Sequence, residues 1–212
     1  MIELLNYLSR VTEQKRYPFF VNVGANDGIT GDPCGEFFLR HFSWTGLLIE
    51  PVPYCVERLK SIYHEQRFSV VQSAVGIRGL KQFYYVFESA KELPDLPPWF
   101  DQLGSFDVQH ILKHLAGRLK PYITSREIFV ETLREVLEVR RIEKVDFLQI
   151  DTEGSDLIVL KSLDGFLKPK AILIEHVHLS ESNRAELLGL LTPDYDVVDL
   201  SRDFFAELKH DG

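Results

Sequence analysis

The sequence predicts a doubly wound α/β fold, in which helices cover both faces of a mostly parallel sheet. Short apolar runs alternate with amphipathic stretches along the chain, and the runs are continuously apolar. Strands of this kind are buried on both faces, and their alternation with helices is typical of parallel strands joined by crossover helices. The length of 212 residues predicts one domain, residues 1–212, because single cores commonly reach this size.

The elements are expected in the following order. An amphipathic N-terminal helix is expected over 1–16, since charged residues interrupt its apolar positions. Asp32-Pro33 provides an N-cap and a first-turn proline for the next helix. Further helices are predicted by apolar spacing at 54–65, 130–141, 155–167 and 181–191. Strands are predicted at 19–23, 46–49, 68–75, 81–87, 145–150, 171–177 and 195–200, and residues 204–208 fit a last strand or a short helix.

Residues 88–126 interrupt this alternation and are expected to form an insertion that covers the active site. The segment contains Pro94, Pro97 and Pro98, followed by an amphipathic stretch over 109–119. Its second half carries basic residues and no acidic one: Lys113, Arg118, Lys120 and Arg126. These residues form either a solvated helix face, as charge runs usually do, or a contact for a phosphorylated or carboxylated substrate.

Composition excludes several classes of protein. Hydrophobic residues make up 45% and charged residues 26%, which is the balance of an ordinary globular protein. The formal charge of −8 argues against a general nucleic-acid binder, and no apolar run is long enough for a membrane span. Cys34 and Cys55 are too few for a disulfide framework, so we expect packing roles for both and a cytoplasmic location.

The turn after the first strand is the first candidate binding element. Gly24-Ala25-Asn26-Asp27-Gly28 follows the apolar run 19–23, and ligands of doubly wound sheets bind at the carboxyl ends of the strands. A dinucleotide fingerprint would need glycines where the chain has Asn26 and Ile29, which disfavours a dehydrogenase. A purely structural turn explains the glycines equally well.

Acidic residues follow several of the other predicted strands. Glu50 ends the second strand 22 residues after Gly28, the spacing at which a carboxylate binds ribose hydroxyls; the alternative is an ordinary solvent-facing glutamate. Small residues, Ser73 and Ala74, end the third strand, and carboxylates follow two later ones: Asp151, Glu153 and Glu175. A rim of carboxylates without a basic residue favours a positively charged nucleoside over a pyrophosphate.

These residues resemble the FkbM family of S-adenosylmethionine-dependent methyltransferases. The resemblance is carried by Val21–Gly28, Gly31-Asp32-Pro33, Trp44-x-Gly46, Ile49–Pro53, Thr132-Leu133, Val145–Gly154 and Ile174-Glu175-His176. It implies a class I methyltransferase (Rossmann-like) fold, a seven-stranded sheet whose last strand, 204–208, is antiparallel, and methylation of a hydroxyl on a small molecule, sugar or glycan, or polyketide-type product.

The resemblance also implies roles for particular residues. The glycine-containing turn would hold the amino-acid part of the cofactor, Glu50 the ribose, and Ser73 and Ala74 the adenine, with Asp151 near the methyl donor. The expected cofactor-binding set is Gly24, Ala25, Asn26, Gly28, Glu50, Pro51, Ser73, Ala74 and Asp151.

An alcohol is a poor nucleophile, so a base must remove its proton. The candidate catalytic residues are Asp151, Glu153, His176 and His110. The candidate substrate contacts are Ser105, Phe106, His110 and His178. For each histidine the alternative is a satisfied or merely exposed side chain, and Glu153 alternatively caps the next helix.

A metal site is possible at the strand ends but not expected. Asp151, Glu175 and His176 offer ligands for Mg²⁺ or Mn²⁺, yet neighbouring strand residues point to opposite faces. His110-x-x-x-His114 lacks the glutamate of a zinc-protease helix because Ile111 follows His110.

A protein of this fold that binds a nucleoside without catalysis, or that serves as an interaction partner, is the alternative. Asp151, Glu153 and His176 favour the enzyme, since a non-catalytic relative needs no acidic and basic groups beside the cofactor. We expect a small-molecule or glycan partner and no nucleic acid.

Overall fold

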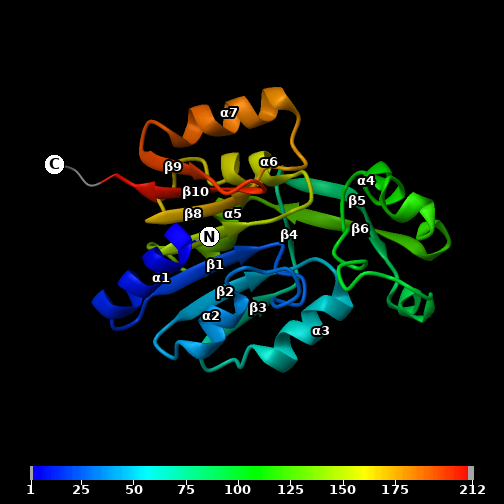
Figure 1. Cartoon of the computed structure of the whole chain (residues 1–212), viewed down its shortest axis with the longest axis horizontal. Coiled ribbons are helices and arrows are strands. Elements are labelled where there is room, and N and C mark those ends of the chain that lie inside the picture. Colours follow the sequence, from blue (N-terminus) through cyan, green and yellow to red (C-terminus); the bar gives the residue numbers. More distant parts are fainter. Residues whose placement is uncertain (1, 210–212) are drawn as a thin grey trace.

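The computed structural model describes residues 2–209 (Figure 1). The main sheet contains β1 (Phe19–Val23), β2 (Thr45–Ile49), β3 (Phe68–Val71), β7 (Phe147–Ile150), β8 (Ala171–Glu175), β9 (Tyr195–Asp199) and β10 (Asp203–Leu208). The helices around it are α1 (Ile2–Gln14), α2 (Gly35–Arg40), α3 (Pro53–Ile62), α5 (Leu133–Val139), α6 (Asp156–Lys161) and α7 (Glu181–Leu191). A smaller sheet consists of β4 (Ala74–Val75), β5 (Gly79–Val86) and β6 (Ile123–Glu131).

The order of the main sheet is β3-β2-β1-β7-β8-β10-β9 within residues 2–209. Pairings from β3 to β8 are parallel, whereas β10 is antiparallel to both β8 and β9. Val23 aligns with Ile49 of β2 and with Ile150 of β7, so three strands end at one edge. Strand order reverses between β1 and β7, which makes this edge the expected ligand site. The predicted seven-stranded α/β fold with an antiparallel last strand is confirmed.

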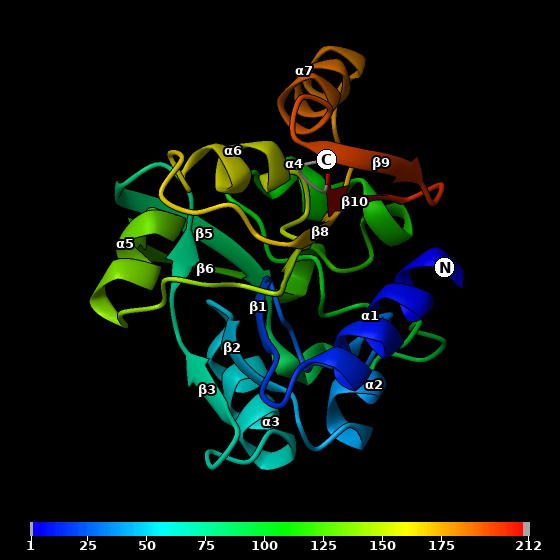
Figure 2. The same ribbon diagram turned by 90° about the vertical axis from the view of Figure 1, so that its left-hand side faces the viewer.

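Two apolar layers hold the helices on the sheet. One layer joins α1, α2 and α3 to the sheet and contains a stacked pair, Phe20 and Phe38, with ring centroids 3.9 Å apart. The other layer joins α5, α6 and α7 to the opposite face. Figure 2 shows α1 and α2 on one side of the sheet and α5 and α6 on the other. The central strands β1, β2, β7 and β8 are buried almost throughout, because they pack against helices on both faces.

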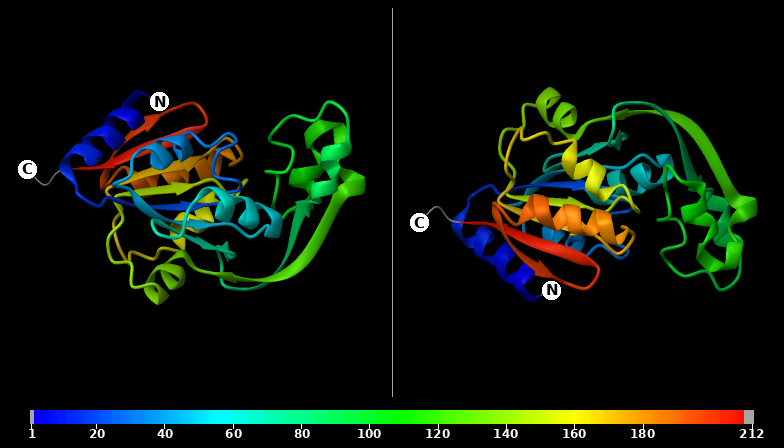
Figure 3. Two further views of the ribbon diagram at one scale, coloured as in Figure 1. Left: turned by 90° about the horizontal axis from the view of Figure 1, so that it is seen from below. Right: turned by 90° about the horizontal axis from the view of Figure 1, so that it is seen from above.

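A lobe projects from the carboxyl edge of the main sheet (Figure 3). We define the lobe as β5, β6 and the residues 87–122 between them, which include α4 (Val108–Leu112) and the 3₁₀ turns Glu88–Glu92, His114–Gly117 and Lys120–Tyr122. It has a core of its own that includes Val86, Phe100, Leu103, Ile111 and Leu119. A second small cluster, Val52, Cys55 and Phe83, joins the lobe to the start of α3.

One helix predicted beside the lobe has the wrong bounds. The predicted helix over 130–141 begins only at Leu133, because residues 123–131 form β6 and pair antiparallel with β5. The amphipathic stretch over 109–119 is helical only to Leu112, since Leu115 and Ala116 adopt left-handed backbone angles (both φ +50°). The ambiguous segment 204–208 is a strand, and the helix predicted over 155–167 is shorter, Asp156–Lys161.

Candidate active site

The turn after β1 is held against the ends of β2 and β7. Gly24 has φ +81°, and a Cβ at this position would lie 1.7 Å from the carbonyl oxygen of Asp151. Only glycine therefore lets the two strand ends approach so closely. Asn26 is left-handed as well (φ +46°), and its backbone N–H donates to Glu50 Oε2 at 2.9 Å. The turn thus lies at the point where strand order reverses between β1 and β7.

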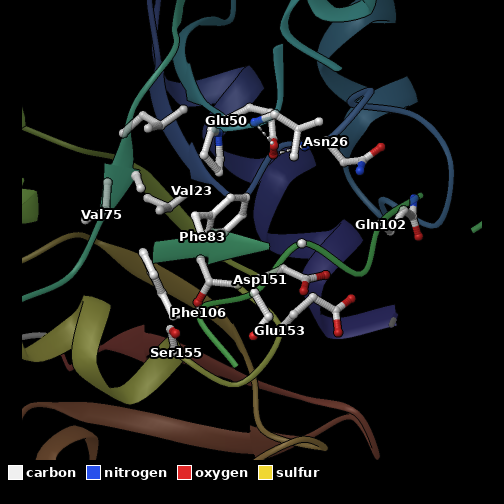
Figure 4. Close-up of a pocket in the computed structure, with 18 of the residues that line it drawn as sticks. Val23, Asn26, Glu50, Val75, Phe83, Gln102, Phe106, Asp151, Glu153 and Ser155 are labelled. Atoms are coloured by element: carbon white, nitrogen blue, oxygen red, sulfur yellow. Dashed lines mark hydrogen bonds between the residues drawn. The ribbon is translucent and has the colours of Figure 1, made fainter. Parts of the chain in front are cut away.

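Glu50 is a buried acidic residue of this edge. Its side chain is buried and accepts hydrogen bonds from the backbone N–H groups of Asn26 (2.9 Å) and Val52 (2.7 Å). Burial is the largest influence on Glu50 and raises its pKa to about 7, although both hydrogen bonds lower it. Figure 4 shows the carboxylate beside Asn26 at the wall of a cavity. The solvent-facing alternative for Glu50 is thereby excluded.

A cavity lies between the ends of β1, β2 and β7 and the lobe, which is where ligands of doubly wound sheets bind. Predicted residues that line it are Gly24, Asn26, Glu50, Pro51, Ser73, Ala74, Asp151, Glu153, Ser105 and Phe106. Apolar walls come from Val23, Ile49, Val75 and Phe83. Among the described lining residues there are several carboxylates and no lysine, arginine or histidine. This composition fits a cationic nucleoside with an apolar base.

Gly28 does not reach the cavity, in contrast to its predicted cofactor contact. Its carbonyl accepts a hydrogen bond from Tyr63 Oη at 2.7 Å, and a Cβ would lie 2.4 Å from the Tyr63 ring. The glycine instead permits close packing of the turn on α3 and the loop after it. Ala25 lines a smaller polar cavity next to the first one.

That smaller cavity contains polar residues for which we predicted no site role. Asp32 accepts hydrogen bonds from Asn22 Nδ2 (3.0 Å) and Gln149 Nε2 (3.2 Å), two side chains on adjacent strands. Gln102, contributed by the lobe, lines the same cavity and donates to the carbonyl of Thr30. A polar residue in the middle of an otherwise apolar strand was the available signal for Asn22 and Gln149. Nothing in the lobe sequence marked Gln102, or the buried Asp101 that pairs with Arg58 at 2.5 Å.

Negative charge is concentrated around Asp151. Burial raises its pKa well above the ordinary value, and the neighbouring charges of Glu175 and Glu153 raise it further. Burial and Glu153 also raise the pKa of Glu175, against the influence of Arg202, whose Nη2 lies 2.8 Å from Glu175 Oε1. A cation bound here would relieve this repulsion. The residues present therefore fit the positively charged cofactor that the sequence predicts.

Three residues from separate segments meet at the outer side of the cavity. His110 of α4 lies with Nε2 2.7 Å from Glu153 Oε2, and His178 Nε2 lies 3.3 Å from the same oxygen. We call His110, Glu153 and His178 the histidine–glutamate cluster. Glu153 has φ +53°, an unusual conformation for a non-glycine residue and one often found at functional sites. Burial is the largest influence on His178 and lowers its pKa to about 4 against the opposing influence of Glu153, so its imidazole is neutral near pH 7.

The lobe supplies the other wall of this region. Ser105 pairs through its backbone with Tyr84 of β5, with N–O distances of 2.9 Å in both directions. Phe106 packs edge-on against Phe83, with ring centroids 5.3 Å apart. A second cavity, which we call the outer cavity, is lined by Ser105, Phe106, His110, Lys113, Glu153 and His178, among other residues. Of the basic residues predicted in the lobe, Lys113 lines this cavity, whereas Arg118 donates to the carbonyl of Pro94 at 2.6 Å. The predicted substrate contacts Ser105, Phe106, His110 and His178 are thus brought together.

His176 is not part of this group. Its Nε2 lies 3.2 Å from Asp199 Oδ1, and its ring centroid is 4.1 Å from that of Phe204. The residue directly follows Glu175 and faces the β9–β10 hairpin, because adjacent residues of an extended chain point in opposite directions. The set Asp151, Glu175 and His176 therefore does not converge on a common point, and the catalytic role predicted for His176 lacks a contact with the cavity.

A family model described as the methyltransferase FkbM domain matches residues 22–200, and a search of curated protein sequences returned no match. Similar solved structures include the Methanococcus jannaschii fibrillarin pre-rRNA processing protein, with a TM-score of 0.49, 13% identity, and coverage of 92% of this chain and 67% of that one. The N-terminal domain of human METTL16 in complex with SAH has a TM-score of 0.48 at 11% identity, over 99% of this chain and 70% of the other.

A third similar solved structure is precorrin-6y C5,15-methyltransferase from Geobacter metallireducens GS-15. Its TM-score is 0.45 at 9% identity, and the match covers 97% of this chain and 87% of that one. In the part of the chain that the structure describes, every helix is too short or too polar to cross a bilayer. The range matched by the family model includes the cavity residues from Gly24 onward and the whole histidine–glutamate cluster.

Proposed function

The chain belongs to the FkbM family of methyltransferases, and from this premise we propose that it transfers a methyl group from S-adenosylmethionine to a hydroxyl oxygen. The acceptor we propose is a small molecule, a sugar or glycan, or a polyketide-type product. One observation supports this most: Glu153 lines both the carboxylate-rich cavity and the outer cavity that contains His110 and His178. A site for a cationic donor thus adjoins a group able to act on an acceptor's proton.

Different residues of the cavity would bind different parts of S-adenosylmethionine. When bound, S-adenosylmethionine supplies an electrophilic methyl group on a positively charged sulfur. Glu50 would accept hydrogen bonds from the ribose hydroxyls, since each of its oxygens already accepts only one backbone N–H. Ser73, Ala74 and the apolar wall of Val75 and Phe83 would flank the base, and Asp151 would lie near the cationic sulfur.

The acceptor side has two tasks, positioning the hydroxyl and removing its proton. Phe106 and Phe83 exclude water from the opening between the lobe and the sheet, which strengthens electrostatic interactions there. The histidine–glutamate cluster is the titratable group at this opening, and holding the hydroxyl against it orients the oxygen toward the cofactor cavity. Such positioning is a large part of the rate gain for a transfer between two bound molecules.

We further propose that the acceptor is not a nucleic acid. The chain has a formal charge of −8, and the cavity lining is acidic, so a polyanion would be repelled at the point of transfer. Lys113 at the outer cavity is the basic side chain placed to meet one anionic group on an otherwise uncharged acceptor.

The test has a binding arm and a transfer arm. In the first, calorimetry measures S-adenosylhomocysteine binding to the untagged protein, with NADH as the negative control. In the second, methyl-labelled S-adenosylmethionine is offered with panels of hydroxylated sugars, glycolipids, polyketide alcohols, amines and RNA. Label in a hydroxyl product supports the proposal. Absence of S-adenosylhomocysteine binding by folded protein, or label only in amines or RNA, overturns it.

A further inference from the structure

The histidine–glutamate cluster brings two imidazoles and one carboxylate to a single point. One ligand atom from each of His110, Glu153 and His178 lies within 4.8 Å of the others. Two of the separations are 2.7 Å and 3.3 Å, both measured to Glu153 Oε2. Ligands bound to one ion at about 2.0–2.2 Å lie about 2.8–3.6 Å apart in octahedral or tetrahedral geometry. The spacing of these three atoms is close to that of a coordination sphere.

The three atoms are not explained by hydrogen bonds to one another. Among residues 2–209, His110 Nε2 and Glu153 Oε2 are both buried and lack a hydrogen-bond partner, although the two atoms lie 2.7 Å apart. The side chain of His110 is only 6% exposed. Buried polar atoms are almost always paired in folded proteins, so a nearly enclosed imidazole aimed at an unpaired carboxylate oxygen indicates a missing partner.

The surroundings favour a cation as that partner. Glu175 Oε2, also buried and without a hydrogen bond among the described residues, lies 3.8 Å from His178 Nε2. Asp151 adds a further acidic group on the cavity side of Glu153. His114 is the neighbouring histidine, with its ring centroid 5.1 Å from that of His110, and its Nε2 is buried and unpaired within the described chain.

We propose that His110, Glu153 and His178 bind one divalent transition-metal ion. Two imidazoles with one carboxylate are a ligand set for Zn²⁺, Fe²⁺ or related ions, whereas Mg²⁺ and Ca²⁺ prefer oxygen ligands alone. This set differs from the His110-x-x-x-His114 pair and from the Asp151, Glu175 and His176 set weighed on the sequence. Three protein ligands leave a coordination position open toward the outer cavity.

The role of the ion rests on the proposed function. In that role, an acceptor hydroxyl coordinated at the open position would have a lowered pKa. It would release its proton to solvent in the outer cavity, because the ligand atoms of His110, Glu153 and His178 would be occupied by the ion. The ion would also join α4 of the lobe to the loops after β7 and β8, since each of these three segments contributes one ligand.

The experiment measures metal binding directly. Untagged, chelator-treated protein is titrated with Zn²⁺ in a calorimeter, and with Co²⁺ as a spectroscopic probe whose visible absorption reports its ligands. The variants are His110→Ala, His178→Ala and Glu153→Gln, and the matched control is His64→Ala, an exposed histidine far from the cluster in the sequence. Circular dichroism shows whether each variant is folded, and titration of the parent protein and the two histidine variants with S-adenosylhomocysteine tests the cofactor cavity separately.

We expect one ion per chain with micromolar or tighter affinity, unchanged by His64→Ala and weakened at least about tenfold by each cluster variant. The Co²⁺ absorption should change in the cluster variants. Absence of stoichiometric metal binding to the parent protein overturns the proposal. Metal binding by His110→Ala and His178→Ala with the same affinity as the parent protein overturns it as well. If the parent protein binds metal but not S-adenosylhomocysteine, the proposed function is refuted and the metal site is not. If it binds S-adenosylhomocysteine but not metal, only the metal site is refuted.

Discussion

Replacing Glu50 by glutamine should weaken cofactor binding without lowering the stability of the protein at pH 8. The carboxylate is buried and already accepts two backbone N–H groups, from Asn26 and Val52. Hydrogen bonds from ribose hydroxyls would therefore add to a charged acceptor that cannot turn away. Losing the charge should reduce the binding free energy by about 1–3 kcal/mol, which is roughly 5- to 150-fold in Kd.

The ionised carboxylate of Glu50 favours cofactor binding, but it lowers the stability of the folded protein. Burial raises the pKa of Glu50 from an ordinary value of 4.5 to about 7, a difference of about 3 kcal/mol at about 1.4 kcal/mol per pH unit. A raised carboxyl pKa means that folding favours the protonated form. The contribution is fully present below about pH 4.5 and is lost as pH rises through about 7. Glutamine stays neutral throughout and so avoids this loss.

Glutamine also has a cost, because its single carbonyl can accept from only one of the two backbone N–H groups. The unpaired donor should cost about 1–3 kcal/mol. At pH 8 the free energy of unfolding of Glu50→Gln should consequently equal that of the parent or exceed it by up to about 2 kcal/mol. Glu50→Ala leaves both donors unpaired and should be less stable than Glu50→Gln.

The assay combines two measurements at pH 5.5, 7 and 8.5. Calorimetry gives the Kd of S-adenosylhomocysteine, and urea denaturation without ligand gives the free energy of unfolding. For the parent protein, affinity should rise with pH while stability falls, because Glu50 ionises over this range; both slopes should flatten in Glu50→Gln. Unchanged affinity in Glu50→Gln would refute the ribose assignment, and a stability loss equal to that of Glu50→Ala would refute the electrostatic reasoning.

Three further predictions concern the frame of the site. Gly24→Ala should lower the free energy of unfolding by about 2–5 kcal/mol, because the new Cβ would overpack against Asp151 and the backbone at this position is left-handed. Urea denaturation measures this loss, and an unchanged midpoint of the urea transition would contradict the prediction. Asp156→Ala should cost about 1–3 kcal/mol, since Asp156 accepts from the backbone of the loop that carries Glu153, and Asp156→Asn should cost less in the same assay. His176→Ala should lower the melting temperature but leave kcat within about twofold, because His176 contacts the β9–β10 hairpin; a tenfold fall in kcat would return it to the catalytic group.

The main sheet was predictable because its signals are local. The strand at 19–23 and the helix at 181–191 have the predicted bounds. β6 was missed because its evidence is non-local: it pairs with β5 across the whole of the segment 87–122. The sequence did contain a signal for the correct helix start, since Thr132 and Glu135 form a capping box at α5.

The cavity at the strand ends was more predictable than the outer cavity beside the lobe. Residues such as Glu50 follow directly from strand ends, and parallel strands bring their ends together wherever they occur. His110 reaches Glu153 only through the fold of the lobe, which lacks a regular pattern. The alternation rule for strands separates His176 from Glu175, but it does not reach His178, which lies in a turn after β8.

The construction of the histidine–glutamate cluster has a consequence for folding kinetics. Its members come from the lobe and from the loops after β7 and β8, so each contact closes a long stretch of chain. Such closures are made late, after contacts within the sheet and within the lobe have compensated the loss of chain entropy. We therefore expect the transition state for folding to lack this joint. An ion or acceptor bound there should lengthen the lifetime of the native state by slowing unfolding, with little effect on the refolding rate.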